Sequence, residues 1–452
     1  MNLLPLPDAW AYGPSARARA NREQYIVASK PVEAVLFGAG GRGRHTFGQY
    51  ALRSADLLKF VAVAEPDAER RETFAREHGI APEHTYPSWE DLVARPQMAP
   101  ALINATMDPM HADSTMAALE AGYHVLLEKP LAVDAVSCVR LVRKAAQKKR
   151  ILQLGHTLRY APFFEALNQM LTTGRIGQML HVNHTEKVAY WHMAHSFVRG
   201  NWGNMARSGP MILAKCCHDM DLLAWMVDRP AVRVASFGAL THFRADWANS
   251  DIPKRCTDGC PIESDCPYSA IRMYLGENTD WPVSTISLDT SIAARRKAVE
   301  TGPYGRCVYR CDNDVVDHQV VTIEFADDVT VSLTMEGHTV ENTRTMRYSG
   351  TEGEICGHLG KNELRVHDFA SGQECLTRPG SYGGGHGGGD PRMCGAFVEA
   401  VRADDPSQVL ASAEAGLEGH LLCFAAEQAR KQNCVVEMDA FRREIEAAAD
   451  KA

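Results

Sequence analysis

A glycine-rich loop near the start of the chain has residue types and spacing that suit the binding of a dinucleotide. The loop reads Gly38, Ala39, Gly40, Gly41, Arg42 and Gly43, and it fits the pattern G-x-G-x-x-G. The first glycine permits a tight turn, the second lets the backbone approach a pyrophosphate, and the third lets a helix pack closely on a sheet. The N-terminus of the following helix supplies amide hydrogens to the phosphates. We expect Gly38, Gly40, Gly41, Arg42 and Gly43 to contact the cofactor.

An acidic residue stands where such a cofactor presents its adenosine ribose. Glu65 follows the apolar run 60–64 and lies 22 residues after Gly43. A carboxylate there accepts hydrogen bonds from the ribose hydroxyls and repels a 2′-phosphate, which favours NAD over NADP. Arg70 and Arg71, one turn into the next predicted helix, weaken that preference.

Five of the thirteen cysteines fall between residues 256 and 311. They are Cys256, Cys260, Cys266, Cys307 and Cys311. Four thiolates can bind a tetrahedral Zn²⁺, and dense cysteine clusters in chains without an export signal usually bind metal. An iron–sulfur cluster fits less well because the spacing matches none of the common ferredoxin runs. We expect four of these five to bind a structural Zn²⁺ in an insert at about residues 246–318, with reduced thiols as the alternative.

Short apolar runs alternate with helical periodicity through residues 31–156, and this alternation predicts a doubly wound parallel sheet. The runs read as strands are 32–37, 60–64, 101–105, 124–127 and 150–154. The segments with helical spacing are 47–58, 68–78, 110–121 and 133–148. We therefore predict a Rossmann domain at 31–156, preceded by an arm at residues 1–30.

The pattern changes after residue 156, where strand-like segments follow one another with few helices between them. The predicted strands are 178–191, 232–241, 316–325, 329–336, 344–349 and 364–368. Helical spacing occurs at 162–173, 393–403 and 411–432, and the glycine-rich stretch 380–389 reads as a loop. Such a pattern predicts a second α/β domain at 157–440 with a large, mostly antiparallel open sheet.

Composition excludes several classes of protein. The chain has 452 residues, of which 45% are hydrophobic and 23% charged, so disorder is a poor interpretation. A formal charge of −8 disfavours nucleic acid or an acidic membrane surface as a partner. No apolar run approaches the roughly 20 residues of a membrane span, and the start lacks the features of a signal peptide. We expect a cytoplasmic protein.

A set of motifs spread over the chain resembles one known family. The matching motifs are the glycine loop, Asn104-Ala105-Thr106 with His111, Gly122-Tyr123-His124-Val125, Glu128-Lys129-Pro130, Gly174-Arg175-Ile176-Gly177 and the segment 208–221. From residue 31 to about 440 the sequence resembles the glucose–fructose oxidoreductase / inositol dehydrogenase / MocA family. Members pair a Rossmann domain with an α/β domain whose open sheet often forms the subunit interface. The resemblance implies a homodimer or homotetramer, a cis peptide before Pro130, and cofactor contacts from Thr106, His111, Glu128 and Lys129.

The resemblance also implies the catalytic residues. Hydride transfer from a secondary alcohol needs a base for the hydroxyl proton and positive charge near the developing alkoxide. Lys129 can supply the charge, and His218, which matches the family's active-site histidine, can take the proton. The family commonly has Asp four residues before this histidine, and here that position is Ala214. Its neighbour Lys215 is the candidate to take over part of the role of that acid.

Further polar and aromatic residues are candidates for substrate contacts. The carboxyl ends of strands bind ligands in doubly wound folds, aromatic rings stack on sugar C–H faces, and arginine binds hydroxyls or anionic groups. The residues expected to contact substrate are His156, Arg159, Trp191, Arg199, Trp202, Asp221 and His386. Core packing is an equal alternative for Trp191 and Trp202, and a mobile surface loop is the alternative for His386.

Together these observations predict an NAD-dependent oxidoreductase acting on a secondary hydroxyl of a sugar, glycoside or cyclitol. Two alternatives stay open. The first is an NAD-dependent glycoside hydrolase that works by transient oxidation and elimination, which the departure at Ala214 and the loop around His386 keep in view. The second is a sensor that binds the cofactor without turnover.

Overall fold

The computed structural model describes residues 30–380 and 385–451. Its N-terminal domain is built on a parallel sheet of six strands. The strand order is β3-β2-β1-β4-β5-β6. The strands are β1 (Val32–Phe37), β2 (Leu58–Ala64), β3 (Thr85–Tyr86), β4 (Ala101–Asn104), β5 (His124–Leu127) and β6 (Leu152–Leu154). Every pairing between neighbours is parallel. The predicted Rossmann fold is confirmed, whereas the predicted arm at 1–30 lies outside the described residues apart from Lys30.

Helices cover both faces of this sheet, and their ends follow from local sequence signals. They are η1 (Gly43–Gly48), α2 (Gln49–Arg53), α3 (Ala68–His78), α4 (Trp89–Val93), α5 (His111–Glu120) and α6 (Ala135–Lys148). Helix α3 begins where the Asp67 side chain accepts the amide of Arg70, and it ends at Gly79 in the left-handed region. The predicted helix 47–58 is wrong at its end, because Leu58 already pairs with Val32 in the sheet.

The second half forms a mixed sheet of nine strands in the order β14-β13-β12-β11-β7-β10-β9-β8-β15. Its strands are β7 (Met179–Ala189), β8 (Ala231–Ala239), β9 (His318–Phe325), β10 (Thr330–Thr339), β11 (Thr343–Gly350), β12 (Gly353–His358), β13 (Glu363–Asp368), β14 (Glu374–Thr377) and β15 (Val436–Glu437). Only β7 and β10 pair in parallel. The predicted open, mostly antiparallel sheet is confirmed. Strand β12 escaped prediction because glycine occupies two of its three buried positions, Gly353 and Gly357, beside Ile355.

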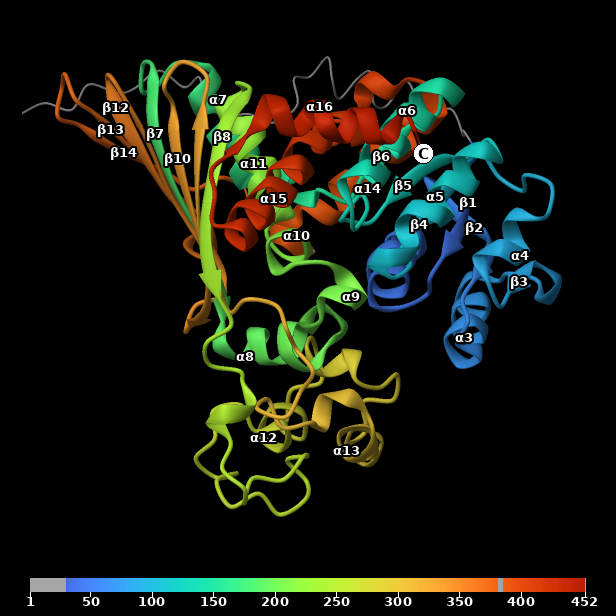
Figure 1. The fold of residues 1–452 in the computed structure, drawn as a ribbon. Helices are drawn as coiled ribbons and strands as arrows, with labels where there is room; N and C mark the ends of the chain where they lie inside the picture. Colours follow the sequence, from blue (N-terminus) through green and yellow to red (C-terminus); the bar gives the residue numbers. More distant parts are fainter. Residues whose placement is uncertain (1–29, 381–384, 452) are drawn as a thin grey trace, which may run out of the picture.

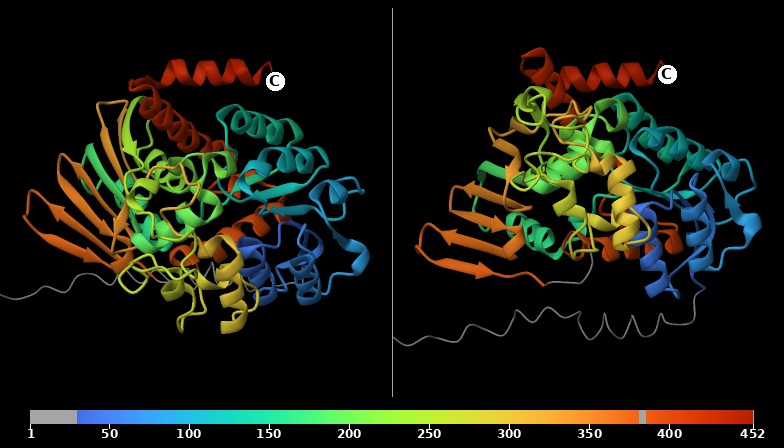
Figure 2. Two further views of the ribbon diagram at one scale, coloured as in Figure 1. Left: turned by 60° about the horizontal axis from the view of Figure 1, so that its bottom comes forward. Right: turned by 90° about the horizontal axis from the view of Figure 1, so that it is seen from below.

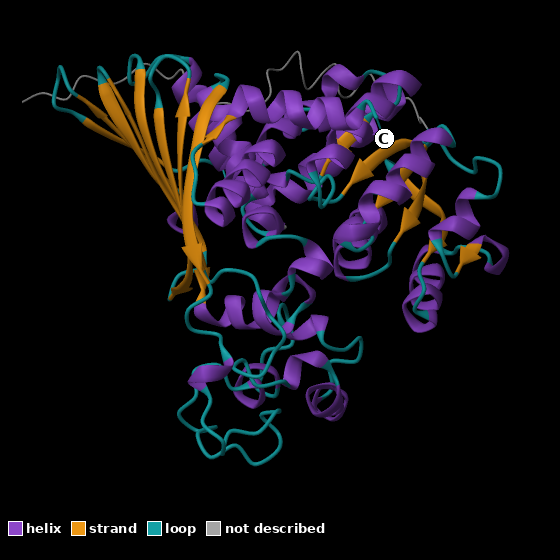
Figure 3. Ribbon diagram, viewed as in Figure 1, coloured by secondary structure: helices purple, strands orange, loops and turns teal. Residues whose placement is uncertain are grey.

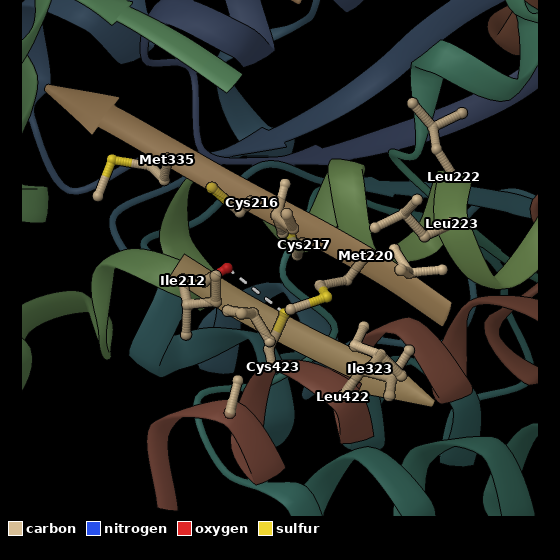
Figure 4. Close-up of a cluster of buried hydrophobic side chains, with 14 of the residues drawn as sticks. Ile212, Cys216, Cys217, Met220, Leu222, Leu223, Ile323, Met335, Leu422 and Cys423 are labelled. Carbon is tan, nitrogen blue, oxygen red and sulfur yellow. Dashed lines mark hydrogen bonds between the residues drawn. The ribbon is translucent and has the colours of Figure 1, made fainter. Parts of the chain in front are cut away.

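Helices pack on one face of this sheet and leave the other face open (Figures 1 and 3). They include α7 (Pro162–Thr172), α10 (Met211–Ala214), α11 (Cys217–Val227), α15 (Ala413–Gln432) and α16 (Met438–Ala449). Helix α14 (Gly385–Ala403) packs instead in the core of the parallel sheet, beside β1. Figure 4 shows the core that joins α10, α11 and α15 to the sheet, where the thiol of Cys423 donates to the carbonyl of Ile212 at 3.4 Å. Cys216 and Cys217 lie in this core fully buried, as packing residues.

The cysteine-rich insert leaves the sheet after β8 and returns at β9. It contains α12 (Ala270–Tyr274) and α13 (Ile292–Thr301) and lies below the sheet in Figure 1. In Figure 2, where the bottom of Figure 1 comes forward, α13 lies on the near side of the molecule, in yellow. The insert's own hydrophobic cluster has only four buried residues, Ala270, Tyr274, Val283 and Val299. Other insert side chains, Tyr268, Val308, Val315 and Val316, are buried in the core of the second domain.

Candidate functional site

The glycine loop is closed against the sheet at two glycines and open at two others. Gly38 has φ of +83°, and an added Cβ would lie 2.4 Å from the carbonyl oxygen of Ala105. A Cβ at Gly43 would lie 1.9 Å from the carbonyl oxygen of Gly38. At Gly40 and Gly41 an added Cβ would meet no atom of the described residues nearer than 4.0 Å. Only glycine therefore fits at positions 38 and 43, where the chain is closely packed. The open space beside Gly40 and Gly41 is what a pyrophosphate needs.

The carboxylate of Glu65 fixes the same loop from the end of β2. One of its oxygens accepts the amide of Ala39 at 2.7 Å, and the other accepts the amide of Asp67 at 3.0 Å. Arg71 turns back and donates to the backbone carbonyl of Glu65 at 2.5 Å. Arg70 is exposed, with a guanidinium nitrogen 4.0 Å from an added Cβ on Gly40. Because each carboxylate oxygen has a further lone pair, Glu65 can still accept from a ribose.

Polar side chains fasten the turns after β4 and β5. The side-chain oxygen of Asn104 accepts from the amide and the hydroxyl of Thr106 at 3.2 and 2.8 Å. The buried ring of His111 has one nitrogen 2.6 Å from the carbonyl oxygen of Pro130 and the other 3.2 Å from that of Thr106. The Lys129–Pro130 peptide is cis. Thr106 and His111 thus hold together the two turns that lead toward the cofactor edge of the sheet. The residues from the glycine loop to Lys129 fit a bound dinucleotide.

Lys129 reaches from the Rossmann domain across to the second domain. Its ammonium donates to the backbone carbonyl of Ala214 at 2.8 Å and lies 5.3 Å from the ring centroid of Trp202. The indole of Trp202 in turn donates to the carboxylate of Asp108 at 2.9 Å. Burial raises the pKa of Asp108 above its ordinary value. Trp202 therefore lines the site beside Lys129. Substrate contact and core packing both stay predictions for it.

His218 lies in the first turn of α11, and other imidazole rings surround it. Its ring centroid is 5.5 Å from that of His156 and 5.7 Å from that of His386. Within the described residues its Nδ1 is buried without a hydrogen-bond partner. Burial lowers the pKa of His218 well below its ordinary value, and the positive charge of Lys129 adds to this effect. The ring is therefore neutral at pH 7 and able to accept a proton.

A chain of charges connects the glycine loop to His386. Arg42 donates to Glu128 at 2.6 Å and, with two nitrogens, to Asp390 at 3.0 and 3.2 Å. Asp390 lies 3.1 Å from Nδ1 of His386. Burial alone would raise the pKa of Asp390, but Arg42 and His386 hold it below its ordinary value. His386, Gly387 and Gly388 have left-handed φ, so the predicted loop continues to the point where regular helix begins in α14.

Two of the expected substrate residues bind each other. Arg159 donates to both carboxylate oxygens of Asp221 at 2.8 Å, through Nε and Nη2. Its Nη1 donates to the carbonyl of Leu410, and Nη2 donates also to that of Ala415. Both side chains are buried. Burial opposes ionisation of Asp221, but Arg159 outweighs it and keeps the pKa below its ordinary value. This pair has the geometry of a buried structural ion pair, with His156 Nδ1 3.0 Å from Asp221.

Lys215 joins a second, largely buried charge network. Its ammonium lies 3.0 Å from Glu186 on β7, and Glu186 also pairs with Arg344 on β11 at 2.8 Å. Arg344 continues to Asp219 at 2.7 Å, and His184 completes the network at 2.8 Å from the same carboxylate. Burial raises the pKa of Glu186. The network anchors the segment before α11 to the large sheet.

Trp191 and Arg199 lie toward the insert. Trp191 packs against Trp281 with a centroid separation of 5.5 Å, and both line an open groove of about 370 Å³ together with Arg272 and Asn278. Arg199 is fully buried and donates to the carbonyl of Arg306 at 2.7 Å. Trp191 therefore borders a space that a ligand can enter, whereas Arg199 belongs to the cysteine region.

Three potential metal ligands, His156, Cys217 and His420, lie within 4.8 Å of one another in the core. Both ring nitrogens of His420 are occupied, one by the amide of Leu131 at 2.8 Å and one by the carbonyl of Gly416 at 2.8 Å. Burial raises the pKa of the Cys217 thiol to about 12. His420 therefore has no free ring nitrogen for a metal, and the Cys217 thiol stays protonated. This group is better explained as buried packing near His218.

Comparison with protein families identifies both halves of the chain. Residues 32–156 match the model for the NAD-binding Rossmann fold of an oxidoreductase family, and residues 168–438 match the model for its C-terminal α/β domain. This chain belongs to the Gfo/Idh/MocA oxidoreductase family. It is thus an oxidoreductase with an NAD-binding Rossmann domain, as the motifs predicted.

Individual members of the Gfo/Idh/MocA family align with this chain over only part of its length or at low sequence identity. Inositol 2-dehydrogenase 3 of Saccharopolyspora erythraea (strain ATCC 11635 and equivalents) is 31% identical over 38% of this chain and 46% of its own length. The 1,5-anhydro-D-fructose reductase of Ensifer adhaerens is 32% identical over 39% of this chain and 51% of its own length. The aligned parts thus span about half of those two proteins. A solved levoglucosan dehydrogenase, in complex with NADH and levoglucosan, has a TM-score of 0.67 at 18% identity and covers 90% of this chain and all of that one. This last likeness shows the shared fold.

For several residues of this site, the sequence pattern did not predict a role. Glu186, Arg344 and Asp108 are isolated charges in apolar or alternating stretches, and only the fold brings them beside Lys215 or Lys129. Asp390 did carry a signal, since it stands four residues after His386 next to a glycine run. Within residues 30–380 and 385–451, no helix has the length and apolar character needed to cross a membrane.

Proposed function

We propose that this protein is an NAD-dependent dehydrogenase that moves hydride between the nicotinamide and a secondary hydroxyl of a sugar, glycoside or cyclitol. The observation that carries the proposal is the position of Lys129. It follows the strand end of the NAD-binding sheet, and its ammonium hydrogen-bonds the turn directly before the helix of His218. A cation and a neutral imidazole therefore face the same space at the cofactor edge. The relatives act on inositol, 1,5-anhydro-D-fructose and levoglucosan, and these activities support the substrate class.

The roles of the residues follow from their charges. When bound, NAD⁺ supplies the acceptor for the hydride. Lys129 donates a hydrogen bond to the substrate oxygen and stabilises its developing negative charge. His218 accepts the hydroxyl proton, because burial keeps its imidazole neutral. His386, held by Asp390 and more exposed than His218, can carry that proton on toward solvent. Trp202 excludes water on the side of Lys129.

A second candidate is the NAD-dependent glycoside hydrolase that works by transient oxidation and elimination. Elimination needs a second proton carrier beside the base, and the His386–Asp390 pair near His218 offers one. The two candidates differ in whether reducing equivalents accumulate.

One experiment separates these functions. The protein is incubated with NAD⁺ and a panel of cyclitols, sugars and aryl glycosides while NADH absorbance and aglycone release are followed together. NADH formation supports the dehydrogenase, and aglycone release without net NADH supports the hydrolase. Silence from the whole panel with intact NAD⁺ binding contradicts both and favours a sensor. Lys129→Met serves as the inactive control in each arm.

The cellular setting and assembly form part of the same proposal. None of the thirteen cysteines, each within the described residues, forms a disulfide, which is typical of a reducing compartment such as the cytoplasm. The open face of the nine-stranded sheet carries the exposed cross-strand pair Phe237 and Val320. We propose that this face joins copies into a homodimer or homotetramer. Light scattering on the wild type and on Phe237→Glu tests it, and a monomeric wild type contradicts it.

A further inference from the structure

Four of the five clustered cysteines surround one enclosed cavity in the insert. Cys256, Cys260, Cys266 and Cys307 all line it, and its volume of about 10 Å³ admits a single water-sized sphere. The fifth, Cys311, does not line the cavity, and its thiol is directed at the carbonyl of Cys307 at 3.3 Å. The fold thus separates one cysteine from the other four.

Backbone pairing brings the distant cysteines together. Arg255 and Arg306 form an isolated antiparallel bridge, the amide of Cys256 donates to the carbonyl of Gly305 at 3.0 Å, and the amide of Cys307 donates to that of Lys254 at 2.8 Å. Neighbours of a bridged pair share the face opposite to it. Cys256 and Cys307 therefore present their side chains to the same side, although 50 residues separate them in the chain.

A backbone donor is aimed at one of the sulfur atoms. The amide of Ala270 lies 3.4 Å from Cys256 Sγ. Amide hydrogens that point at sulfur stabilise a thiolate over a thiol. Such donors are the usual surroundings of metal-bound cysteines.

Arg199 supplies an independent observation. Its guanidinium lines the cavity and is 1% exposed, with one nitrogen 3.7 Å from Cys256 Sγ. Its other contacts are the carbonyls of Arg306 and Tyr268. Nη1 has no partner, and no carboxylate among the described residues forms an ion pair with it. A buried cation without a counter-charge is costly.

We propose that Cys256, Cys260, Cys266 and Cys307 bind one Zn²⁺ as a structural tetrathiolate centre, with Arg199 as its counter-charge. Binding converts four thiols to thiolates and releases four protons, so that Zn²⁺ and four sulfurs carry a net charge of −2. The size of the cavity favours a single ion over an iron–sulfur cluster. No three of the sulfurs lie mutually within 4.8 Å in the described insert, so a Zn–S distance of about 2.3 Å requires the thiols to rotate inward. The centre adds a cross-link to an insert whose own hydrophobic cluster has only four buried residues.

Metal analysis with a matched cysteine control tests the assignment. Wild-type protein purified without chelator from medium containing zinc and iron should hold about one equivalent of Zn²⁺ per chain. Cys260→Ser and Cys266→Ser should lose most of it, whereas Cys311→Ser should keep it. Less than about three tenths of an equivalent in the wild type overturns the proposal. Equal loss in Cys311→Ser overturns the choice of ligands, and iron with broad visible absorbance overturns the choice of metal.

Two further measurements do not depend on the folding of the serine variants. Titration of the wild type with an organomercurial, in the presence of a chromogenic zinc indicator, should release Zn²⁺ as the insert thiols react; reaction of those thiols without release contradicts the proposal. Arg199→Gln should lose Zn²⁺ to a competing chelator about tenfold more readily. Arg296→Gln, an exposed change in the same insert, should match the wild type. Equal retention by both arginine variants removes Arg199 from the centre.

Discussion

The ammonium of Lys129 donates a 2.8 Å hydrogen bond to the backbone carbonyl of Ala214, and this bond joins the NAD-binding sheet to the second domain. The family resemblance implies an aspartate at position 214, where this chain has alanine. Here a backbone oxygen serves as the acceptor, and Lys215 turns to Glu186 instead. The position of Lys129 therefore depends on a backbone carbonyl. A change of side chain at residue 214 does not remove that oxygen.

Lys129→Met should lower turnover sharply while leaving the affinity for the cofactor nearly unchanged. Loss of one donor to a developing oxyanion lowers kcat by about 10² to 10³. The Kd for NAD⁺ should stay within about threefold of the wild type, since Lys129 faces the substrate oxygen in the proposed role. Steady-state NADH formation and fluorescence titration measure the two quantities. Lys144→Met, a change in an exposed ion pair with Glu120, is the control, and undiminished kcat in Lys129→Met removes the lysine from the mechanism.

The pH profile should report His218. Because burial lowers its pKa, the imidazole stays in its basic form below pH 6.5, and the acid limb of kcat/KM for alcohol oxidation should lie below that value. His218→Asn should lower kcat by about 10² to 10⁴ and remove this limb. If His218→Asn keeps the acid limb of the kcat/KM profile, a group other than His218 accepts the hydroxyl proton.

Stability should fall in mild acid because of the histidines buried in neutral form. Burial lowers the pKa of His420, His192 and His195 to about 3. The unfolded chain binds protons near pH 6.5 and the folded chain does not, so the free energy of unfolding falls as the pH falls from 6.5 toward 3. Each such histidine contributes up to about 1.4 kcal/mol per pH unit. Urea unfolding at pH 7.5 and 5.5 measures this loss, and His420→Gln should reduce the pH dependence, whereas His181→Gln at the surface should not.

Glu65→Gln should weaken NAD⁺ binding and reduce the preference over NADP⁺. A hydrogen bond to a charged acceptor contributes about 1.5–3 kcal/mol, so the Kd for NAD⁺ should rise about tenfold or more. Titration with both cofactors measures the change in preference. Glu69→Gln, which alters an exposed carboxylate in the adjoining helix, is the control. Unchanged affinity for both cofactors would contradict a ribose contact.

Asp221→Asn should destabilise the fold more than it affects substrate. Removal of the charge leaves Arg159 buried and unpaired, which costs about 3–5 kcal/mol. Urea unfolding measures this loss, and KM should stay within about threefold where the variant is folded. A large rise in KM without loss of stability would restore Asp221 to the substrate contacts.

The sequence alone determined the features that depend on neighbours along the chain. The glycine loop, Glu65 and the Glu128–Lys129–Pro130 turn each require a strand end and a helix start at fixed spacing, so local pattern was enough to predict the Rossmann fold. Alternation of buried and exposed positions likewise predicted the large sheet. Glycine-rich strands such as β12 gave too little hydrophobic signal.

Only the tertiary structure decided which distant side chains meet. Arg159 and Asp221 both follow the pattern of ligand-binding residues, yet the fold pairs them with each other in the core. Arg199, expected near a sugar, instead lies buried beside Cys256, and Cys311 stands apart from the other four clustered cysteines. Contacts across 50 or more residues depend on how sheets and helices pack, and burial then sets whether a charge is available to a ligand or is used by its neighbour.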